Sequence, residues 1–256
     1  MIYKKSPEEI AIMRRAGALV AESLELMRRA ISPGVTTRQL DGIAEETIRA
    51  GGATPSFLGY RGFPASICAS PNEVIVHGFP SDTPLEEGDI ISLDVGAHLE
   101  GFHADSAWTF PVGRVSDEAA ALLKVTEESL WAALDQCRPG NRLGDLGWAV
   151  EEVAEGAGFS VVREYVGHGV GRALHEDPQI PNYGPAGRRE TLKPGMTLAI
   201  EPMVNAGGPG TKSLSDGWTV VTADGSLSAH FEHTVAITEA GHEVLTQAPI
   251  TGPGAE

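Results

Sequence analysis

Residues 90–110 read IISLDVGAHLEGFHADSAWTF, two apolar runs joined by a short polar turn that contains a glycine. Runs of this composition on either side of a turn predict a β-hairpin. Asp94 interrupts the first predicted strand and Asp105 the second. A turn at Leu99-Glu100 would set the two aspartates directly opposite each other. A shifted turn would change the partners and keep both side chains on one face, because strand side chains alternate with a period of two. Their separation is then about 5 Å, or about 7–8 Å on a diagonal.

Two carboxylates this close repel each other unless a proton or a cation lies between them. A shared proton and a divalent metal ion are both compatible with the pattern. A third alternative is that one aspartate caps a turn while the other is solvated. The apolar residues on both flanks favour a buried pair.

The second half of the chain repeats this theme. Residues 196–203 form an apolar run that reaches Glu201, and residues 229–237 form another with Glu232 inside it. Glu232 alone could equally face water on an edge strand. Taken together, four such carboxylates carry a charge of about −4, which two divalent ions would balance.

Two similar helical units precede these strands. The first has a helix capped by Ser6, Pro7 and Glu9, and a second helix from about Thr37 to Ala50. The second unit has helices predicted from about Asp117 to Cys137 and from Leu143 to Glu155. A shift of 106 positions places Pro33-Gly34 on Pro139-Gly140, Glu45-Glu46 on Glu151-Glu152 and Gly52 on Gly158. Chance similarity of two amphipathic helix pairs is the alternative, but matches in one frame favour a duplicated module. The two halves would extend over about 6–112 and 113–245, and a site would form where they meet.

Composition restricts the class of protein. A net charge of −16 repels phosphate backbones and disfavours direct nucleic-acid binding. The sequence has no run of 18 apolar residues and its N-terminus has no apolar signal core, so we expect neither a membrane span nor a secretory route. Two cysteines, Cys68 and Cys137, are too few for a disulfide framework and fit a reducing cytoplasm.

Three of the eight histidines stand out. His77 follows an apolar run and precedes a glycine, His168 lies between two glycines that allow close approach of a ligand, and His175 precedes two acidic residues. The others are interpreted as surface or hydrogen-bonded core residues. They are His98, His103, His230, His233 and His242.

These residues fall in motifs that closely resemble the type I methionine aminopeptidases, and the resemblance extends from about Ile2 to Leu245. It implies the pita-bread fold, an α+β domain in which a duplicated module with pseudo-twofold symmetry places central antiparallel sheets between flanking helices. We expect one catalytic domain over 1–248 and a flexible tail over 249–256. The motifs are Asn72–Gly78, Asp94–Gly96, Ala104–Ala107, Gly167–Gly171, His175–Pro178, Glu201–Met203 and Phe231–Thr234.

The resemblance also implies a ligand set for two divalent ions. Asp105 and Glu232 would bridge the ions, and Asp94, His168 and Glu201 would complete their coordination. One imidazole with several carboxylates suits Co²⁺, Mn²⁺, Fe²⁺ or Zn²⁺.

In the implied reaction, a hydroxide that bridges the ions attacks the first peptide bond. Glu201 would act as the base, His175 would stabilise the oxyanion, and His77 would contact the scissile amide nitrogen.

The implied substrate is the N-terminal methionine of nascent polypeptides with a small second residue. Its side chain would enter a pocket formed by Phe57, Tyr60, Phe63, Cys68 and Trp218. Phe57, Phe63 and Leu174 depart from residues common in the family, which leaves the pocket shape open. We expect a monomer that is not bound to a membrane; ribosome association stays open.

Two other functions share this pattern. A prolidase or X-Pro aminopeptidase has the same ligands but usually carries an additional N-terminal domain, whereas this chain begins directly with the catalytic module. A binding protein on the same fold usually lacks some of the ligands, and all five are present here.

Overall fold

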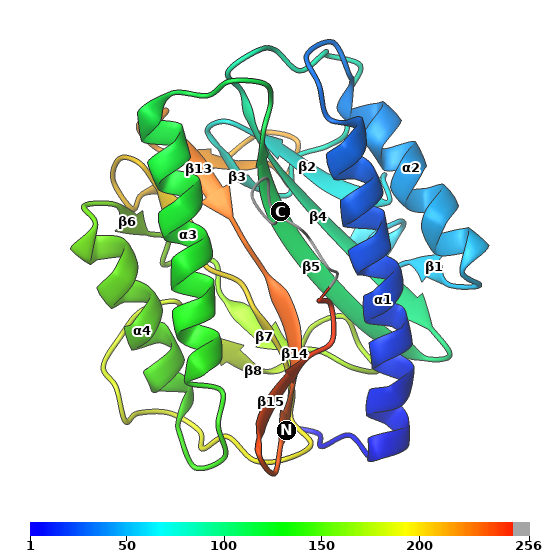
Figure 1. Cartoon of the computed structure of the whole chain (residues 1–256), viewed down its shortest axis with the longest axis vertical. Helices are drawn as coiled ribbons and strands as arrows, with labels where there is room; N and C mark the ends of the chain where they lie inside the picture. Colours follow the sequence, from blue (N-terminus) through cyan, green and yellow to red (C-terminus); the bar gives the residue numbers. More distant parts are fainter. Residues whose placement is uncertain (248–256) are drawn as a thin grey trace, which may run out of the picture.

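The computed structural model describes residues 1–247, so the tail predicted over 249–256 lies outside the described residues. The helices form two pairs, α1 with α2 and α3 with α4, and each pair packs over the strands of its own half of the molecule (Figure 1). Their bounds are α1 Pro7–Ala30, α2 Thr37–Ala50, α3 Asp117–Asp135 and α4 Leu143–Gly156, with a short 3₁₀ turn, η1, at Tyr60–Gly62.

The strands form four small antiparallel sheets. In the first half β4 pairs with β1, β2 and β5, and in the second the order is β15-β14-β9-β7-β8. Two three-stranded sheets have the orders β13-β10-β6 and β11-β12-β3. The bounds are β1 Thr54–Pro55, β2 Ile67–Pro71, β3 Val74–Val76, β4 Ile90–Leu99, β5 Phe102–Pro111, β6 Ser160–Val161, β7 Gly167–Gly169, β8 Glu176–Ile180, β9 Thr197–Ile200, β10 Met203–Asn205, β11 Thr211–Ser213, β12 Val220–Thr222, β13 Ser228–His230, β14 His233–Thr238 and β15 Gly241–Val244.

The helices begin and end where the sequence predicts, with one difference. At α1, Ser6 Oγ accepts the Glu9 N–H at 3.3 Å, and the Ser6 N–H donates to Glu9 Oε2 at 2.8 Å, which is the expected capping box. α3 ends at Asp135, two residues before the predicted Cys137. There the Cys137 N–H donates to Leu134 O three residues back, at 2.9 Å, so the α-helix tightens into a 3₁₀-type turn ahead of Pro139.

The two halves match in local geometry. Gly34 and Gly140, which the shift of 106 positions superimposes, both have φ of 95°. The Gly34 N–H donates to Leu85 O at 2.8 Å, and the Gly140 N–H donates to Leu192 O at 3.1 Å. The same turn therefore follows the first helix of each pair, as a duplicated module requires.

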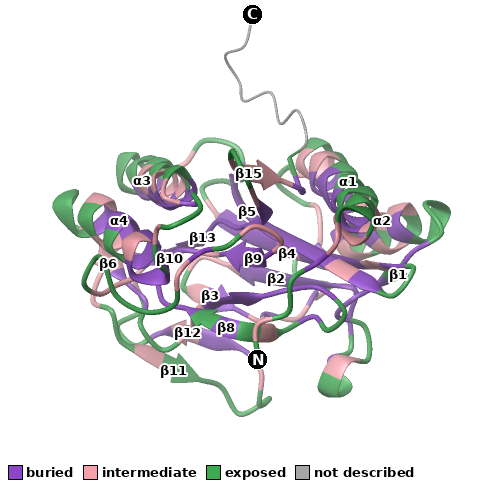
Figure 2. Ribbon diagram, turned by 90° about the horizontal axis from the view of Figure 1, so that it is seen from below, coloured by how far each residue is buried: buried purple, intermediate pink, exposed green. Residues whose placement is uncertain are grey.

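Both helix pairs cover the same side of the strands (Figure 2). Buried residues of α1, such as Val20 and Leu24, belong to one core cluster with Ile91 and Leu93 of β4. The halves meet at β5, where Ala107 O accepts the Glu232 N–H at 2.8 Å. Within residues 1–247, no α-helix covers the opposite side of the strands (Figure 2).

The β4–β5 hairpin keeps the predicted face but not the register with the turn at Leu99-Glu100. The turn is Glu100-Gly101, and both residues have positive φ, 48° and 86°. Such a turn matches the twist of the strands and favours glycine at its second position. Asp94 pairs with Ala107 and Asp105 pairs with Gly96, so the two aspartates are diagonal neighbours rather than direct partners.

The strand predicted through Glu232 is also interrupted. β13 ends at His230 and β14 begins at His233. Between them, the Phe231 N–H donates to Pro202 O at 3.2 Å and the Glu232 N–H donates to β5. The break turns the Glu232 side chain into the space between the halves. In the part of the chain that the structure describes, no helix is long and apolar enough to span a membrane.

Candidate metal centre

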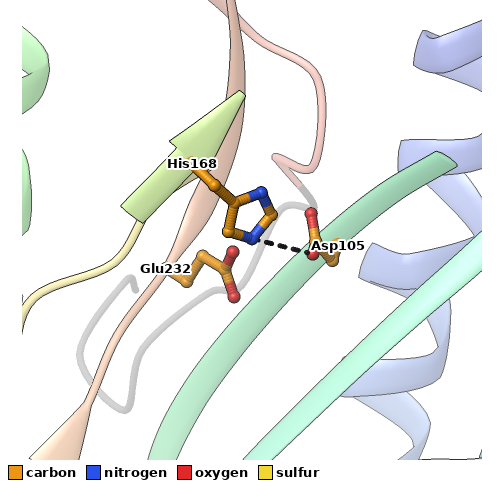
Figure 3. A group of neighbouring side chains, drawn as sticks. All are labelled: Asp105, His168 and Glu232. Atoms are coloured by element: carbon orange, nitrogen blue, oxygen red, sulfur yellow. Dashed lines mark ion pairs between the residues drawn. The ribbon is translucent and has the colours of Figure 1, made fainter. Parts of the chain in front are cut away.

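Three side chains from both halves of the chain converge at the centre of the molecule. Asp105 comes from β5, His168 from β7 and Glu232 from the break before β14, and one ligand atom of each lies within 4.8 Å of the others. All three are buried. Figure 3 shows the His168 ring directed at Asp105, with Nε2 3.7 Å from Asp105 Oδ2.

The two remaining predicted ligands line the same pocket. Glu201 follows β9, and its Oε1 lies 3.5 Å from His168 Nε2. Asp94 projects from β4, and its Oδ1 is buried without a hydrogen-bond partner among residues 1–247. An unpartnered buried carboxylate oxygen is costly, so it indicates a group that the protein itself does not supply.

The ring nitrogens of His168 have separate tasks. Nδ1 lies 2.9 Å from Gly169 O. A carbonyl oxygen only accepts hydrogen bonds, so Nδ1 carries the proton and Nε2 presents its lone pair to the carboxylates. Such an outer hydrogen bond orients a histidine for a metal ion.

Asp105 is held in a similar way. Its N–H donates to Thr234 Oγ1 at 3.1 Å, and the Thr234 hydroxyl lies 2.8 Å from Asp105 O and 3.2 Å from Asp105 Oδ1. Thr234 is fully buried on β14. The contact joins the sheets of the two halves at the point where the carboxylate enters the site.

The carboxylates are electrostatically unfavourable as an unneutralised set. Burial, followed by the charges of the neighbouring carboxylates, raises the pKa of Asp94 and of Glu232 well above the usual range. Burial raises the pKa of Glu201 to about 8, although the nearby His168 opposes the shift. Burial also raises the pKa of Asp105, against the effects of His168 and the Thr234 hydroxyl. Four buried or half-buried acids close to the His168 imidazole therefore fit a site for divalent cations, which would favour the ionised forms.

An apolar pocket opens directly onto this centre. Phe63 lies edge-on to Trp218 with ring centroids 5.1 Å apart, and edge-on to Phe57 at 6.5 Å. Partly buried aromatic side chains pack against the buried residues of this apolar pocket. All the predicted substrate-binding residues line it together with Leu174, namely Phe57, Tyr60, Phe63, Cys68, His77, His175 and Trp218.

The two predicted catalytic histidines both line the pocket. His175 Nδ1 is 3.0 Å from the Tyr60 hydroxyl, and its ring centroid is 4.3 Å from that of His168. The His77 ring is edge-on to Trp218 at 5.9 Å, and its backbone has a positive φ of 62°. Burial lowers the pKa of His77 to about 4; burial and then His168 lower the pKa of His175 to about 3. Both rings are therefore neutral at physiological pH.

Sequence reasoning missed His230, which it assigned to ordinary packing. The ring is buried and lines the pocket, and its Nε2 lies 3.5 Å from Glu201 Oε2 without a hydrogen bond in residues 1–247. A signal was available, because His230 and Glu232 are two positions apart in the predicted strand and share a face. Of the other four histidines, none lines this pocket.

A second, more open groove shares His77, His168, His175 and Glu201 with the aromatic pocket. Its lining also includes residues that the sequence did not single out: Glu164, Tyr165, Val166 and Gln179. The site thus combines an apolar pocket with a more open, more polar groove.

The comparisons with known proteins agree with this geometry. The model of metallopeptidase family M24 matches residues 11–239, and the chain belongs to that family. Methionine aminopeptidase 1 of Bacillus subtilis is 57% identical over 247 residues, which cover 96% of this chain and 100% of the relative. The crystal structure of methionine aminopeptidase from Rickettsia prowazekii has a TM-score of 0.95 at 44% identity, covering 96% of this chain and 100% of that one. Within the family, the similarity is thus to methionine aminopeptidases.

The alternative enzymes share the fold. Prolidase from Pyrococcus furiosus matches with a TM-score of 0.78 at 24% identity, covering 96% of this chain and 65% of that one. Identity this low shows the common pita-bread architecture alone.

Proposed function

We propose that this chain removes N-terminal methionine from peptides and proteins whose second residue is small. The observation that carries the proposal is one continuous pocket, apolar at its closed end and lined by the acidic cluster at its mouth. A thioether side chain suits an aromatic pocket that also contains the Cys68 sulfur. The similarity to methionine aminopeptidases over nearly the whole chain supports the same substrate.

Two divalent ions would be held by Asp94, Asp105, His168, Glu201 and Glu232. Co²⁺, Mn²⁺, Fe²⁺ and Zn²⁺ all suit this donor set. When bound, such ions supply a Lewis acid and lower the pKa of a coordinated water toward neutrality.

Glu201 is our candidate for the general base. It is buried beside His168 and His230, and burial raises its pKa to about 8 in the absence of ions. A carboxylate in this environment takes up a proton readily and can pass it to the departing amine.

His175 would stabilise the oxyanion. If the Tyr60 hydroxyl donates to Nδ1, the neutral ring carries its proton on Nε2 and can donate it to the developing negative charge. His77, which also lines the pocket, would contact the amide nitrogen of the scissile bond.

Exopeptidase selectivity follows from the shape of the site. The closed aromatic end leaves room for one side chain, and the substrate's free amine would lie beside the carboxylates. The rest of the peptide would leave through the open groove past His77 and Tyr165. We further propose that residues 1–248 act as one catalytic unit, and that the enzyme works in the cytoplasm, where Cys68 and Cys137 stay as the free thiols that the structure contains.

The test is hydrolysis of Met-Ala-Ser by the full chain, before and after chelation, with Co²⁺, Mn²⁺, Fe²⁺ and Zn²⁺ added back one at a time. The proposal predicts cleavage that chelation abolishes and at least one ion restores. Cleavage of Gly-Pro in preference to Met-Ala-Ser would indicate the prolidase alternative. Absence of turnover with every ion would indicate the binding-protein alternative.

A further inference from the structure

We infer that Lys5 and Glu176, which form a buried ion pair, are positioning residues that hold the His175 loop against the active site. The loop is the segment 171–175, between β7 and β8, and Glu176 is the first residue of β8. The inference rests on the proposed function, because it assigns to the pair an effect on turnover through His175.

The ion pair is unusually enclosed. Lys5 Nζ lies 2.6 Å from Glu176 Oε2, and the side chains are only 4% and 7% exposed. Lysine and glutamate are rarely buried to this degree unless they are paired. The other Glu176 oxygen, Oε1, accepts the Ala173 N–H at 3.1 Å, so the carboxylate also closes its own loop.

The surroundings are shaped to admit the lysine. A Cβ atom on Gly171 would lie 2.2 Å from Lys5 Cε and 2.9 Å from Glu176 Oε1, so any larger residue there would force the ion pair to shift. The backbone of Lys5 is fixed as well, since its N–H donates to Gly195 O at 2.7 Å just before β9. The lysine thus joins the segment before α1 to the loop that precedes β8.

The loop carries two residues of the site. Leu174 lines the aromatic pocket, and His175 directly precedes Glu176 and contacts the Tyr60 hydroxyl at 3.0 Å. Among the proposed ligands, His168 and Asp105 have supports outside this loop, the Gly169 carbonyl and the Thr234 hydroxyl. Loss of the ion pair should therefore displace His175 while the ligand set stays in place.

A second tie from the same loop is more exposed. Arg172 pairs with Glu9 of α1, and its side chain is 69% exposed. Solvent weakens such a pair, so it cannot replace the buried one.

The experiment compares Lys5→Met with the wild-type chain in hydrolysis of Met-Ala-Ser, at a temperature well below the melting transition of both. Lys5→Met should lower kcat about tenfold or more, since a displacement of about 1 Å can cost up to a hundredfold. Bound metal, measured by plasma mass spectrometry, should be unchanged. Arg14→Met is the matched control, because it breaks an exposed ion pair between α1 and Glu243 of β15. It should leave kcat unchanged.

A double-mutant cycle separates positioning from general stability. In a His175→Ala background, Lys5→Met should cause almost no further loss, because the group through which it acts is gone. An equal loss in both backgrounds, or an unchanged kcat in the single variant, would overturn the inference. If Lys5→Met fails to fold, Glu176→Gln removes the charge and keeps an acceptor for Ala173.

A crystal structure of the folded variant gives a readout without activity. The His175–Tyr60 contact should be lost or lengthened, and an unmoved His175 would contradict the inference. If the wild-type chain itself has no turnover, the proposed function fails, and this structural comparison still tests the positioning.

Discussion

The carboxyl groups of Glu232 and Asp94 are enclosed by protein, and the charges of neighbouring carboxylates make their ionisation less favourable. Each has a pKa raised first by burial and then by other carboxylates. Asp94 Oδ1 also lacks a hydrogen-bond partner among the described residues. Other protein groups do not stabilise these carboxylates in their ionised form. Divalent cations would, because the closely spaced negative charges that repel one another would attract the cations.

Glu232→Gln should therefore act in opposite directions on metal and on stability. Metal content and turnover should fall by at least a hundredfold, because the substitution removes a shared ligand. The metal-free variant should unfold at a higher urea concentration than the metal-free wild type near pH 8, since it lacks a carboxyl group whose ionisation burial opposes in the folded state. Glu243→Gln, which alters an exposed carboxylate, is the control and should change neither property. Full metal content in the Glu232 variant would refute the ligand assignment.

His175→Ala should separate catalysis from metal binding. The ring lies beside His168 but is held by Tyr60, and it is not part of the cluster within 4.8 Å. We expect kcat to fall about 10²–10³-fold, as for removal of one oxyanion donor, with metal content unchanged. Steady-state kinetics measures the fall in kcat, and elemental analysis measures the metal content. Loss of metal would mean that His175 is a ligand.

At the scale of elements, the β4–β5 hairpin shows what a sequence can and cannot determine. Strand side chains alternate between the two faces with a period of two. A hairpin register that is shifted by one residue pair therefore still leaves Asp94 and Asp105 on the same face. The register depends on which two residues form the turn, and Glu100-Gly101 adopts it with positive φ at both positions. A Glu-Gly pair is a turn signal that points to this answer.

The helices and the five proposed ligands could be anticipated because each depends on local signals, such as caps, glycine stops and acids in apolar runs. Tyr165 could not be ranked in this way, because a tyrosine outside the predicted strands has ordinary explanations. Only the contact between the Tyr165 and His77 rings brings it to the site. His230 had the weaker signal of sharing a face with Glu232, and its contact with Glu201 appears only in the fold.

The cap of α2 allows a test of local stability. Thr36 Oγ1 accepts the Gln39 N–H at 3.3 Å, and the Thr36 N–H donates to Gln39 Oε1 at 2.9 Å. Thr36→Ala should lower the free energy of unfolding by about 1 kcal/mol. Thr47→Ala, inside the same helix, is the control and should cost less, because alanine is the better helix former. Equal midpoints for Thr36→Ala and wild type in urea would show that the cap contributes nothing.

For the whole molecule, the duplication explains where the site lies. The first half supplies Asp94 and Asp105, and the second supplies His168, Glu201 and Glu232. The halves join through β5 and the segment around Glu232, so the acidic residues come together only when both halves are folded. Folding thus places these acidic groups close together. The free-energy cost of doing so depends on pH and on bound metal.

The metal-free protein should lose stability as the pH rises from about 7.5 to about 8. In this window the pocket histidines are neutral in the folded state, where their pKa values are about 3 to 4, and are largely neutral when unfolded. Glu201, with a folded pKa of about 8, keeps its proton in the folded state and loses it on unfolding. The folded state therefore binds more protons, and stability falls with rising pH by on the order of 1 kcal/mol per pH unit.

Urea midpoints at several pH values, in chelator and in excess Mn²⁺, check this slope. Metal should remove the decline because cations favour the ionised acids. Stability that rises with pH in chelator over this window would contradict the electrostatic account. Below pH 6.5 the histidines have the opposite effect and make stability rise with pH, because the unfolded histidines bind protons that the buried rings do not bind.

The central claim is that a pair of cations neutralises the acidic cluster. The most direct measurement is an anomalous difference map from crystals of the full chain grown with Mn²⁺. The account predicts two peaks enclosed by Asp94, Asp105, His168, Glu201 and Glu232, with Asp105 and Glu232 touching both. A map without density between these side chains, or carboxylates turned away from one another into solvent, would contradict it.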